Sequence, residues 1–174
     1  GHGPVELTSV DVLRKDWPAL VQALVQSSSS TYQVMLGMRP IDARDAFLEG
    51  KGDAVVGELD TDLGRAMVYD ALMDPELALC LLEQTAPGEQ ASRARLLNAD
   101  QSNTSVVFDE RLILKLFRRV GDGPNPDVEV TRALAETGFS AVPRPVGEWA
   151  GGGGHLAVVT EFLAGGVDGF HLAL

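Results

Sequence analysis

One lysine inside an aliphatic run is the first side chain of this sequence that could act on a charged ligand. Lys115 lies within residues 112–117, LILKLF. Alternation along a strand places it on one face with Ile113 and Phe117, and leaves the three leucines on the other face. If the lysine is partly buried, its ammonium group needs a negative partner. Alternatively, Lys115 is a solubilising lysine on an edge strand, which needs no partner.

The expected partner is Glu129, one turn into a helix predicted over residues 125–137. A strand lysine held by a helix glutamate is the arrangement with which kinase lobes direct a fixed positive charge at nucleotide phosphates. An ordinary ion pair between two elements uses the same residue types, so the pattern leaves both interpretations open.

A polar segment precedes the lysine strand and consists of Gln101, Ser102, Asn103, Thr104 and Ser105. We expect a turn between two strands, at the position where kinases keep a phosphate-covering loop. Its hydroxyl and amide groups could donate to phosphate oxygens, although the same residues form many turns that bind nothing. Downstream, residues 158–163 run from an apolar strand into Ala164-Gly165-Gly166, an exit where backbone groups could pair with an adenine edge.

The elements around these residues fall into two groups. Alternating and clustered apolar residues predict strands over residues 5–13, 19–26, 31–38, 54–59 and 65–70, followed by a helix that Asp74 caps and Pro87-Gly88 ends. The second group comprises strands over 93–97, 105–108, 112–117, 145–149 and 156–161 and the helix over 125–137. We therefore predict an α+β fold with units at residues 1–90 and 91–174.

The glycine run at residues 151–154 joins the last two predicted strands. We interpret it as a flexible loop that is either a hairpin tip or a mobile insertion, and a solvated loop without function is the plainer alternative.

Composition narrows the classes of function. The 174 residues carry a formal net charge of −11, of which −9 falls in residues 1–90. This disfavours a nucleic-acid partner, because binding to phosphates needs clustered lysine and arginine. A single cysteine, Cys80, excludes an internal disulfide and fits a cytoplasmic location. No apolar run approaches the roughly 20 residues of a membrane span, so no membrane partner is expected.

Three segments together resemble the corresponding stretch of actinobacterial maltokinases, which belong to the aminoglycoside-phosphotransferase-like kinases. They are residues 101–108 (QSNTSVVF), 111–119 (RLILKLFRR) and 125–130 (NPDVEV), and the resemblance extends upstream through residues 32–34, 50–52 and 69–72. It implies a cystatin-like cap, a curved antiparallel sheet with a helix, followed by a kinase-like N-lobe. It also implies ATP and magnesium as cofactors and maltose as the phosphate acceptor.

The resemblance implies nucleotide-binding roles for the residues at matching positions. Lys115 would contact the ATP phosphates and Glu129 would hold it, while the 101–105 turn would cover the phosphates. Glu161 and Leu163 would offer backbone groups to adenine. The family's catalytic aspartate and metal-binding residues lie in a C-terminal lobe that is absent here, so no catalytic or metal-ligating residue is expected in this chain and the fragment alone should be inactive.

Two alternatives stay open at this point. Relatives with the same cap and lobe could phosphorylate another sugar, such as glucosamine. The chain could also be a non-catalytic module whose acidic cap binds another protein, and the resemblance names trehalose synthase as a candidate partner.

Overall fold

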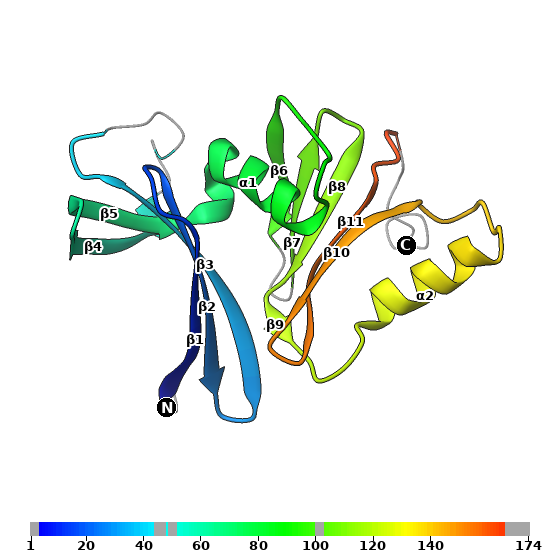
Figure 1. Cartoon of the computed structure of the whole chain (residues 1–174), viewed down its shortest axis with the longest axis horizontal. Helices are drawn as coiled ribbons and strands as arrows, with labels where there is room; N and C mark the ends of the chain where they lie inside the picture. Colours follow the sequence, from blue (N-terminus) through cyan, green and yellow to red (C-terminus); the bar gives the residue numbers. More distant parts are fainter. Residues whose placement is uncertain (1–3, 44–47, 49–51, 100–102, 166–174) are drawn as a thin grey trace.

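The computed structural model describes residues 4–43, 48, 52–99 and 103–165, which form two antiparallel sheets and two α-helices (Figure 1). The predicted α+β fold is confirmed. The strands are β1 (Val5–Arg14), β2 (Ala19–Ser27), β3 (Ser30–Pro40), β4 (Val55–Thr61), β5 (Gly64–Asp70), β6 (Ala94–Ala99), β7 (Asn103–Phe108), β8 (Leu112–Phe117), β9 (Arg119–Val120), β10 (Pro145–Gly151) and β11 (Gly154–Glu161). The helices are α1 (Pro75–Thr85) and α2 (Pro126–Glu136), and short 3-10 turns occupy Gly52–Ala54 and Ala71–Met73.

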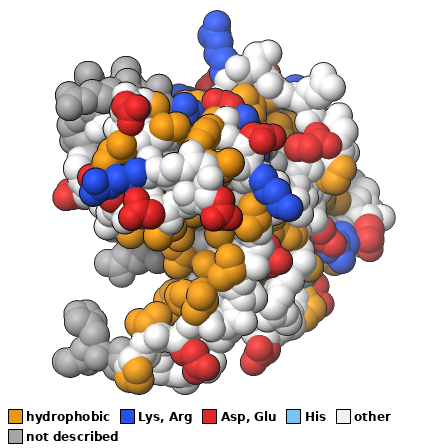
Figure 2. All heavy atoms as spheres, turned by 60° about the vertical axis from the view of Figure 1, so that its left-hand side comes forward, with side chains coloured by type: hydrophobic (Ala, Val, Ile, Leu, Met, Phe, Trp, Pro, Cys, Tyr) orange, Lys and Arg blue, Asp and Glu red, His pale blue; other side chains and the backbone are white. Residues whose placement is uncertain are grey.

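The first sheet has the strand order β1-β2-β3-β5-β4, with β9 added beside β3. Its two faces differ. One face packs against α1, whereas the other leaves large apolar side chains exposed on β1, among them Val5, Leu7, Val10 and Val12. These four pair with Ser27, Val25, Ala23 and Val21 of β2 and so share one face. Figure 2 shows hydrophobic side chains gathered across this side of the molecule.

Helix α1 begins where the sequence predicts. The Asp74 carboxylate accepts a hydrogen bond from the Glu76 backbone N–H at 2.9 Å, and Pro75 occupies the first turn. The helix ends at Thr85, two residues before Pro87. Cys80 is half-buried and accepts a hydrogen bond from Arg14 at 3.6 Å, so it is less buried than its apolar neighbours in the sequence suggest.

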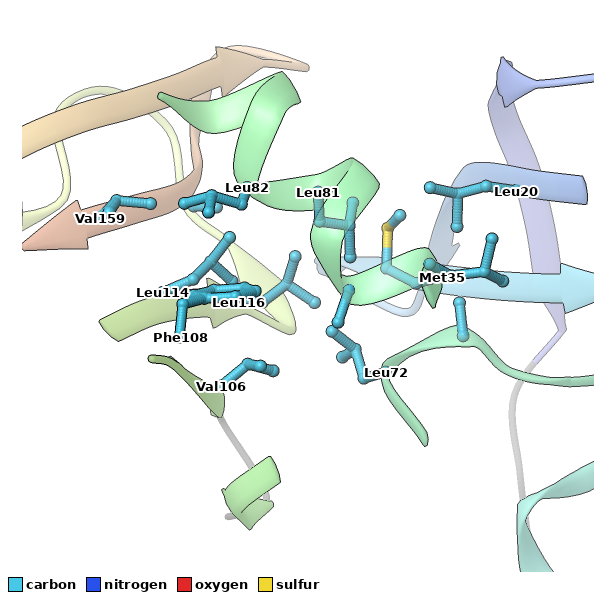
Figure 3. Close-up of a cluster of buried hydrophobic side chains, with 14 of the residues drawn as sticks. Leu20, Met35, Leu72, Leu81, Leu82, Val106, Phe108, Leu114, Leu116 and Val159 are labelled. Atoms are coloured by element: carbon cyan, nitrogen blue, oxygen red, sulfur yellow. The ribbon is translucent and has the colours of Figure 1, made fainter. Parts of the chain in front are cut away.

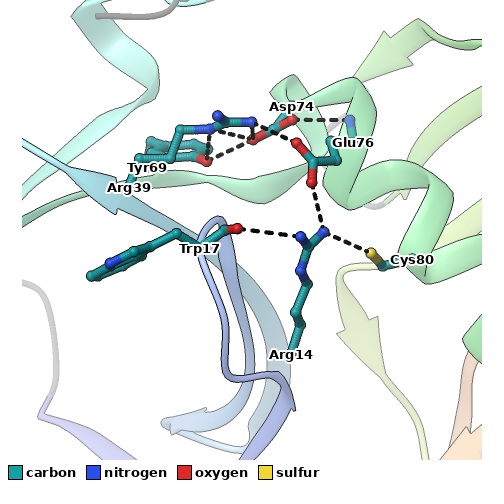
Figure 4. A network of polar contacts seen from close by, with 7 residues as sticks. All are labelled: Arg14, Trp17, Arg39, Tyr69, Asp74, Glu76 and Cys80. Atoms are coloured by element: carbon teal, nitrogen blue, oxygen red, sulfur yellow. Dashed lines mark hydrogen bonds and ion pairs between the residues drawn. The ribbon is translucent and has the colours of Figure 1, made fainter. Parts of the chain in front are cut away.

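The same cap aspartate anchors α1 to the first sheet (Figure 4). Asp74 is almost fully buried and accepts hydrogen bonds from the Tyr69 hydroxyl at 2.7 Å and from Arg39 Nε at 3.0 Å. Burial opposes the charge on Arg39, but the hydrogen bonds to Asp74 and Tyr69 outweigh it and raise the pKa of Arg39. Arg14 adds a second link, an ion pair with Glu76 at 2.8 Å.

Helix α1 lies between the two sheets and joins them into one core (Figure 3). Leu81 and Leu82 lie between side chains of the first sheet, such as Leu20 and Met35, and side chains of the second sheet. The latter include Val106, Phe108, Leu114, Leu116 and Val159. The boundary near residue 90 stays a prediction, since the hydrophobic core is continuous across it.

The second sheet has the order β10-β11-β8-β7-β6 and carries a helix on each face. Leu112, Leu114 and Leu116 of β8 face α1, as the predicted alternation requires. On the other face Val128 of α2 packs with Phe117 and Val158. The Lys115 face of β8 is therefore the face that α2 covers.

The glycine run is a hairpin tip that packs against the rest of the protein. Gly152 and Gly153 both have positive φ, as a two-residue turn between antiparallel strands requires. The Gly153 carbonyl accepts a hydrogen bond from the Gly123 N–H at 2.8 Å, and Gly154 forms a bridge with Gly123. Of the two alternatives, the structure shows the hairpin tip.

Within the described ranges no helix is long and apolar enough to cross a lipid bilayer.

Candidate nucleotide site

Lys115 lies at the centre of the second sheet. On β8 it pairs with Ser105 of β7 on one side and with Val158 of β11 on the other. Its ammonium group forms an ion pair with Asp127 in the first turn of α2 and lies 5.9 Å from the centre of the Phe117 ring. The lysine is therefore a strand lysine held by a helix carboxylate and is not a solubilising lysine on an edge strand.

The carboxylate differs from the one that the sequence predicts. Glu129 is exposed and has no ion pair with any described residue, whereas Asp127 takes the lysine. The reason is geometric. At 3.6 residues per turn, positions 127 and 129 point about 200° apart around the helix axis, so only one of them can face β8. The Lys115–Glu129 pair is thus corrected to Lys115–Asp127.

A cavity of about 440 Å³ opens beside this ion pair, between α2 and the sheet. Its walls are mostly apolar, with the lysine, an aspartate and a few hydroxyls as the polar groups. The lining residues are Ser105, Ile113, Lys115, Pro126, Asp127, Val130, Thr131, Pro143, Val158 and Thr160. An apolar pocket with a few convergent polar groups is typical of a small-molecule site.

The described part of the polar segment before the lysine strand is strand and not turn. Gln101 and Ser102 lie outside the described residues. Asn103, Thr104 and Ser105 belong to strand β7 instead of a turn. Ser105 lines the cavity, whereas Thr104 is buried and accepts a hydrogen bond from Arg118 Nε at 2.7 Å. Because Thr104 and Ser105 are neighbours on a strand, they point to opposite faces, and only one of them can serve this cavity.

The two residues expected to contact adenine lie at the end of the last strand. Glu161 is the final residue of β11 and its N–H donates to the Arg144 carbonyl at 3.0 Å. The side-chain hydrogen bond from Arg144 lowers the pKa of Glu161 below its usual value. Leu163 follows the strand with 58% of its surface exposed. Neither residue is among those that line the cavity.

Sequence reasoning missed the contribution of Asp127, Val158 and Thr160. Pairing places Val158 opposite Lys115 and Thr160 opposite Ile113, on the same face of the sheet. The signal for Asp127 was present, since an acidic residue two positions after the helix cap Asn125 is placed in the first turn. The contribution of Val158 and Thr160 depends on the register of β11 with β8, and no short sequence motif encodes that register.

No group of three or more histidine, cysteine, aspartate or glutamate side chains is placed to hold a metal ion anywhere in the described part of the chain.

Comparison with known proteins agrees with this architecture. Residues 1–74 match the family described as the maltokinase N-terminal cap domain. This part of the chain is therefore similar to the cap domain of maltokinases. The matched residues contain all of β1 to β5 and end at the aspartate that caps α1, and we therefore call the first sheet the cap sheet.

A solved structure resembles the whole chain. It is that of a glucosamine kinase (crystal form A), and it superposes with a TM-score of 0.58 at 21% sequence identity. The alignment covers 99% of this chain and 38% of the glucosamine kinase, so this chain spans well under half of that protein's length. At this identity the likeness shows the fold, in which a cap is followed by a kinase-like lobe.

Proposed function

We propose that this chain is the N-terminal, nucleotide-binding part of an ATP-dependent sugar kinase, and that maltose is the sugar. The cap family and the glucosamine kinase fold support a kinase-related maltokinase region. The observation that carries the nucleotide proposal is the Lys115–Asp127 ion pair at the edge of an apolar cavity of about 440 Å³.

The residues that line the cavity fit a nucleoside triphosphate. A base can enter between apolar side chains such as Ile113 and Val158, and the ammonium of Lys115 can contact phosphate oxygens. Asp127 positions the lysine by fixing its side chain against the N-terminal turn of α2. Magnesium would be held mainly by a further lobe, which would also supply the base that activates the sugar hydroxyl.

Nucleotide titration of this chain tests the site. We expect Lys115→Met to weaken ATP binding at least tenfold, measured by calorimetry, because the apolar part of the side chain stays while the charge is lost. Asp127→Asn should weaken binding less, since it frees the lysine without removing it. Glu129→Gln is the matched control on the same helix and should leave the affinity unchanged. An unchanged affinity in Lys115→Met would contradict the proposal.

The sugar is tested in a protein that also contains the C-terminal lobe. A panel of maltose, glucose and glucosamine with ATP should yield maltose 1-phosphate as the main product. Glucosamine is the second candidate because the structural neighbour is a glucosamine kinase, and preferential phosphorylation of glucosamine would overturn the maltose assignment. The present chain alone should form no sugar phosphate.

A further inference from the structure

A second cavity, of about 540 Å³, lies between the cap sheet and the tip of the β10–β11 hairpin. It shares no lining residue with the cavity beside Lys115. Its volume falls within the range of about 300–1,000 Å³ that small-molecule sites occupy. The cap contributes strands β1 and β2 and Thr31 of β3, and the second sheet contributes Trp149 and the glycines of the hairpin tip.

The floor of this cavity contains an amide with unmet hydrogen bonds. Gln22 of β2 is 1% exposed, and its Nε2 finds no hydrogen-bond partner among the described residues. Buried polar groups in native proteins are nearly always paired with protein, water or ligand, and leaving one unpaired costs about 1–3 kcal/mol. Gln22 lines the cavity, so a ligand there can supply the missing partner once the buried amide turns toward it.

The other polar groups around Gln22 narrow the chemistry of that ligand. Asp11 is opposite Gln22 in the β1–β2 ladder, and Ser9 is opposite Leu24. Both therefore share the inner face of the cap sheet with Gln22, and Thr8 and Thr31 add hydroxyl groups. Among the described residues that line the cavity, Asp11 is the one ionisable side chain, and none is a lysine or arginine. An anionic ligand such as a sugar phosphate would thus meet a negative charge without a compensating positive one.

The opposite wall is aromatic. Trp149 of β10 lines the cavity and is half-buried against the core. An indole ring offers a flat apolar face, whereas the cap side offers donors and acceptors for hydroxyl groups. A sugar ring matches both walls, because its C–H face is apolar and its rim carries hydroxyls. We infer that this cavity is a binding site for a neutral saccharide, separate from the nucleotide site.

The glycine tip packs against the cap side of the cavity. A Cβ built on Gly152 would lie 2.5 Å from Leu24 Cδ1, so the hairpin backbone contacts this side chain of the cap sheet closely. Gly153 is fastened to Gly123 by the 2.8 Å hydrogen bond described above. The site is therefore formed before a ligand arrives, and binding requires little ordering of the protein.

The inference is tested by titrating this chain with maltose and maltotetraose. Calorimetry gives the affinity, and the indole N–H signal of Trp149 in ¹H–¹⁵N NMR spectra reports contact, with Trp17→Phe used to assign it. We expect millimolar or tighter binding, a shift of the Trp149 signal, and weaker binding of maltose 1-phosphate than of maltose.

The decisive variant is Gln22→Leu. It removes the amide while keeping a similar volume, so we expect an unchanged or raised melting temperature together with at least a tenfold loss of saccharide affinity. Asp11→Asn keeps the shape and should weaken maltose binding while reducing the discrimination against maltose 1-phosphate. Gln33→Leu is the matched control, because Gln33 is 2% exposed and has unpaired amide atoms but does not line the cavity.

Three results would overturn the inference. The first is that the unmodified chain binds no saccharide at tens of millimolar. The second is that Gln22→Leu and Asp11→Asn leave the saccharide affinity unchanged. The third is that maltose 1-phosphate binds as tightly as maltose. ATP titration of the same samples separates this inference from the proposed function. Intact ATP binding without saccharide binding refutes the saccharide site alone, and saccharide binding without ATP binding refutes the nucleotide site alone.

Discussion

The hydroxyl of Tyr69 illustrates how single residues fix the start of α1. Tyr69 is fully buried on the cap sheet and donates its hydrogen bond to Asp74, which caps the helix. Burial and the hydrogen bond to Asp74 raise the pKa of Tyr69 above its ordinary value of about 10. The folded protein therefore holds the phenolic proton more tightly than the unfolded chain does.

This shift makes the free energy of unfolding depend on alkaline pH. The stabilisation is fully present below about pH 10 and is lost as the pH rises further, because the unfolded tyrosine then releases a proton that the folded one keeps. We expect a loss of about 1.4 kcal/mol per pH unit above pH 10 from this group. Urea unfolding at pH 8 and pH 11 measures it.

Tyr69→Phe should remove that part of the pH dependence and lower the stability at pH 8 by about 1–2 kcal/mol, since Asp74 and Arg39 each lose a partner. Tyr32→Phe is the control, because Tyr32 is exposed. A pH dependence in Tyr69→Phe equal to that of the unmodified chain would contradict the assignment.

At this scale the sequence identified Lys115 but not its partner. Strand alternation is enough to place Lys115 opposite the three leucines of β8. The choice between Asp127 and Glu129 depends on how α2 is rotated about its axis, which Val128 fixes by packing on Phe117 and Val158. Those contacts join three separate elements, and no local pattern records them.

The hairpin of β10 and β11 is the element whose details depend most on distant contacts. A Cβ built on Gly154 would lie 2.1 Å from the backbone oxygen of Gly121, and backbone cannot rotate away as a side chain can. We expect Gly154→Ala to lower the free energy of unfolding by about 1–3 kcal/mol, as overpacking does. Thermal and urea unfolding measure the loss.

Gly52→Ala provides the comparison for that variant, because nothing lies within 4 Å of a Cβ built there. A melting temperature for Gly154→Ala equal to that of Gly52→Ala would mean that the hairpin tip does not approach residue 121 this closely.

Most element bounds follow from local chemistry. The predicted strands of the cap and β8 agree with the structure to within a few residues, Asp74 caps α1 as predicted, and Asn125 caps the helix predicted over residues 125–137. For the glycine run at residues 151–154, local chemistry could not decide between the two alternatives. Its positive φ angles permit a turn, but whether that turn is docked depends on Gly121, Gly123 and Leu24, which are far away in the sequence.

At the level of the whole molecule, α1 holds the cap and the second sheet together. Leu81 is 1% exposed within a core that both sheets share. We expect Leu81→Ala to lower the free energy of unfolding by about 2–5 kcal/mol. Because the core is continuous, circular dichroism and tryptophan fluorescence should report one coincident transition in this variant.

Leu63→Ala is the exposed counterpart and should change the stability little, since 59% of Leu63 is exposed. Two separate transitions in Leu81→Ala would show that the cap and the second sheet unfold independently.

Strand β9 contains only Arg119 and Val120, yet it carries the chain from the lysine strand directly into the cap sheet, where it pairs with Tyr32 and Thr31 of β3. Arg118, the single residue between β8 and β9, binds Asp70 of the cap at 2.9 Å and Thr104 of the lobe. Lys115 is therefore only four residues along the backbone from the cap sheet, so a displacement of the cap strands would act almost directly on β8.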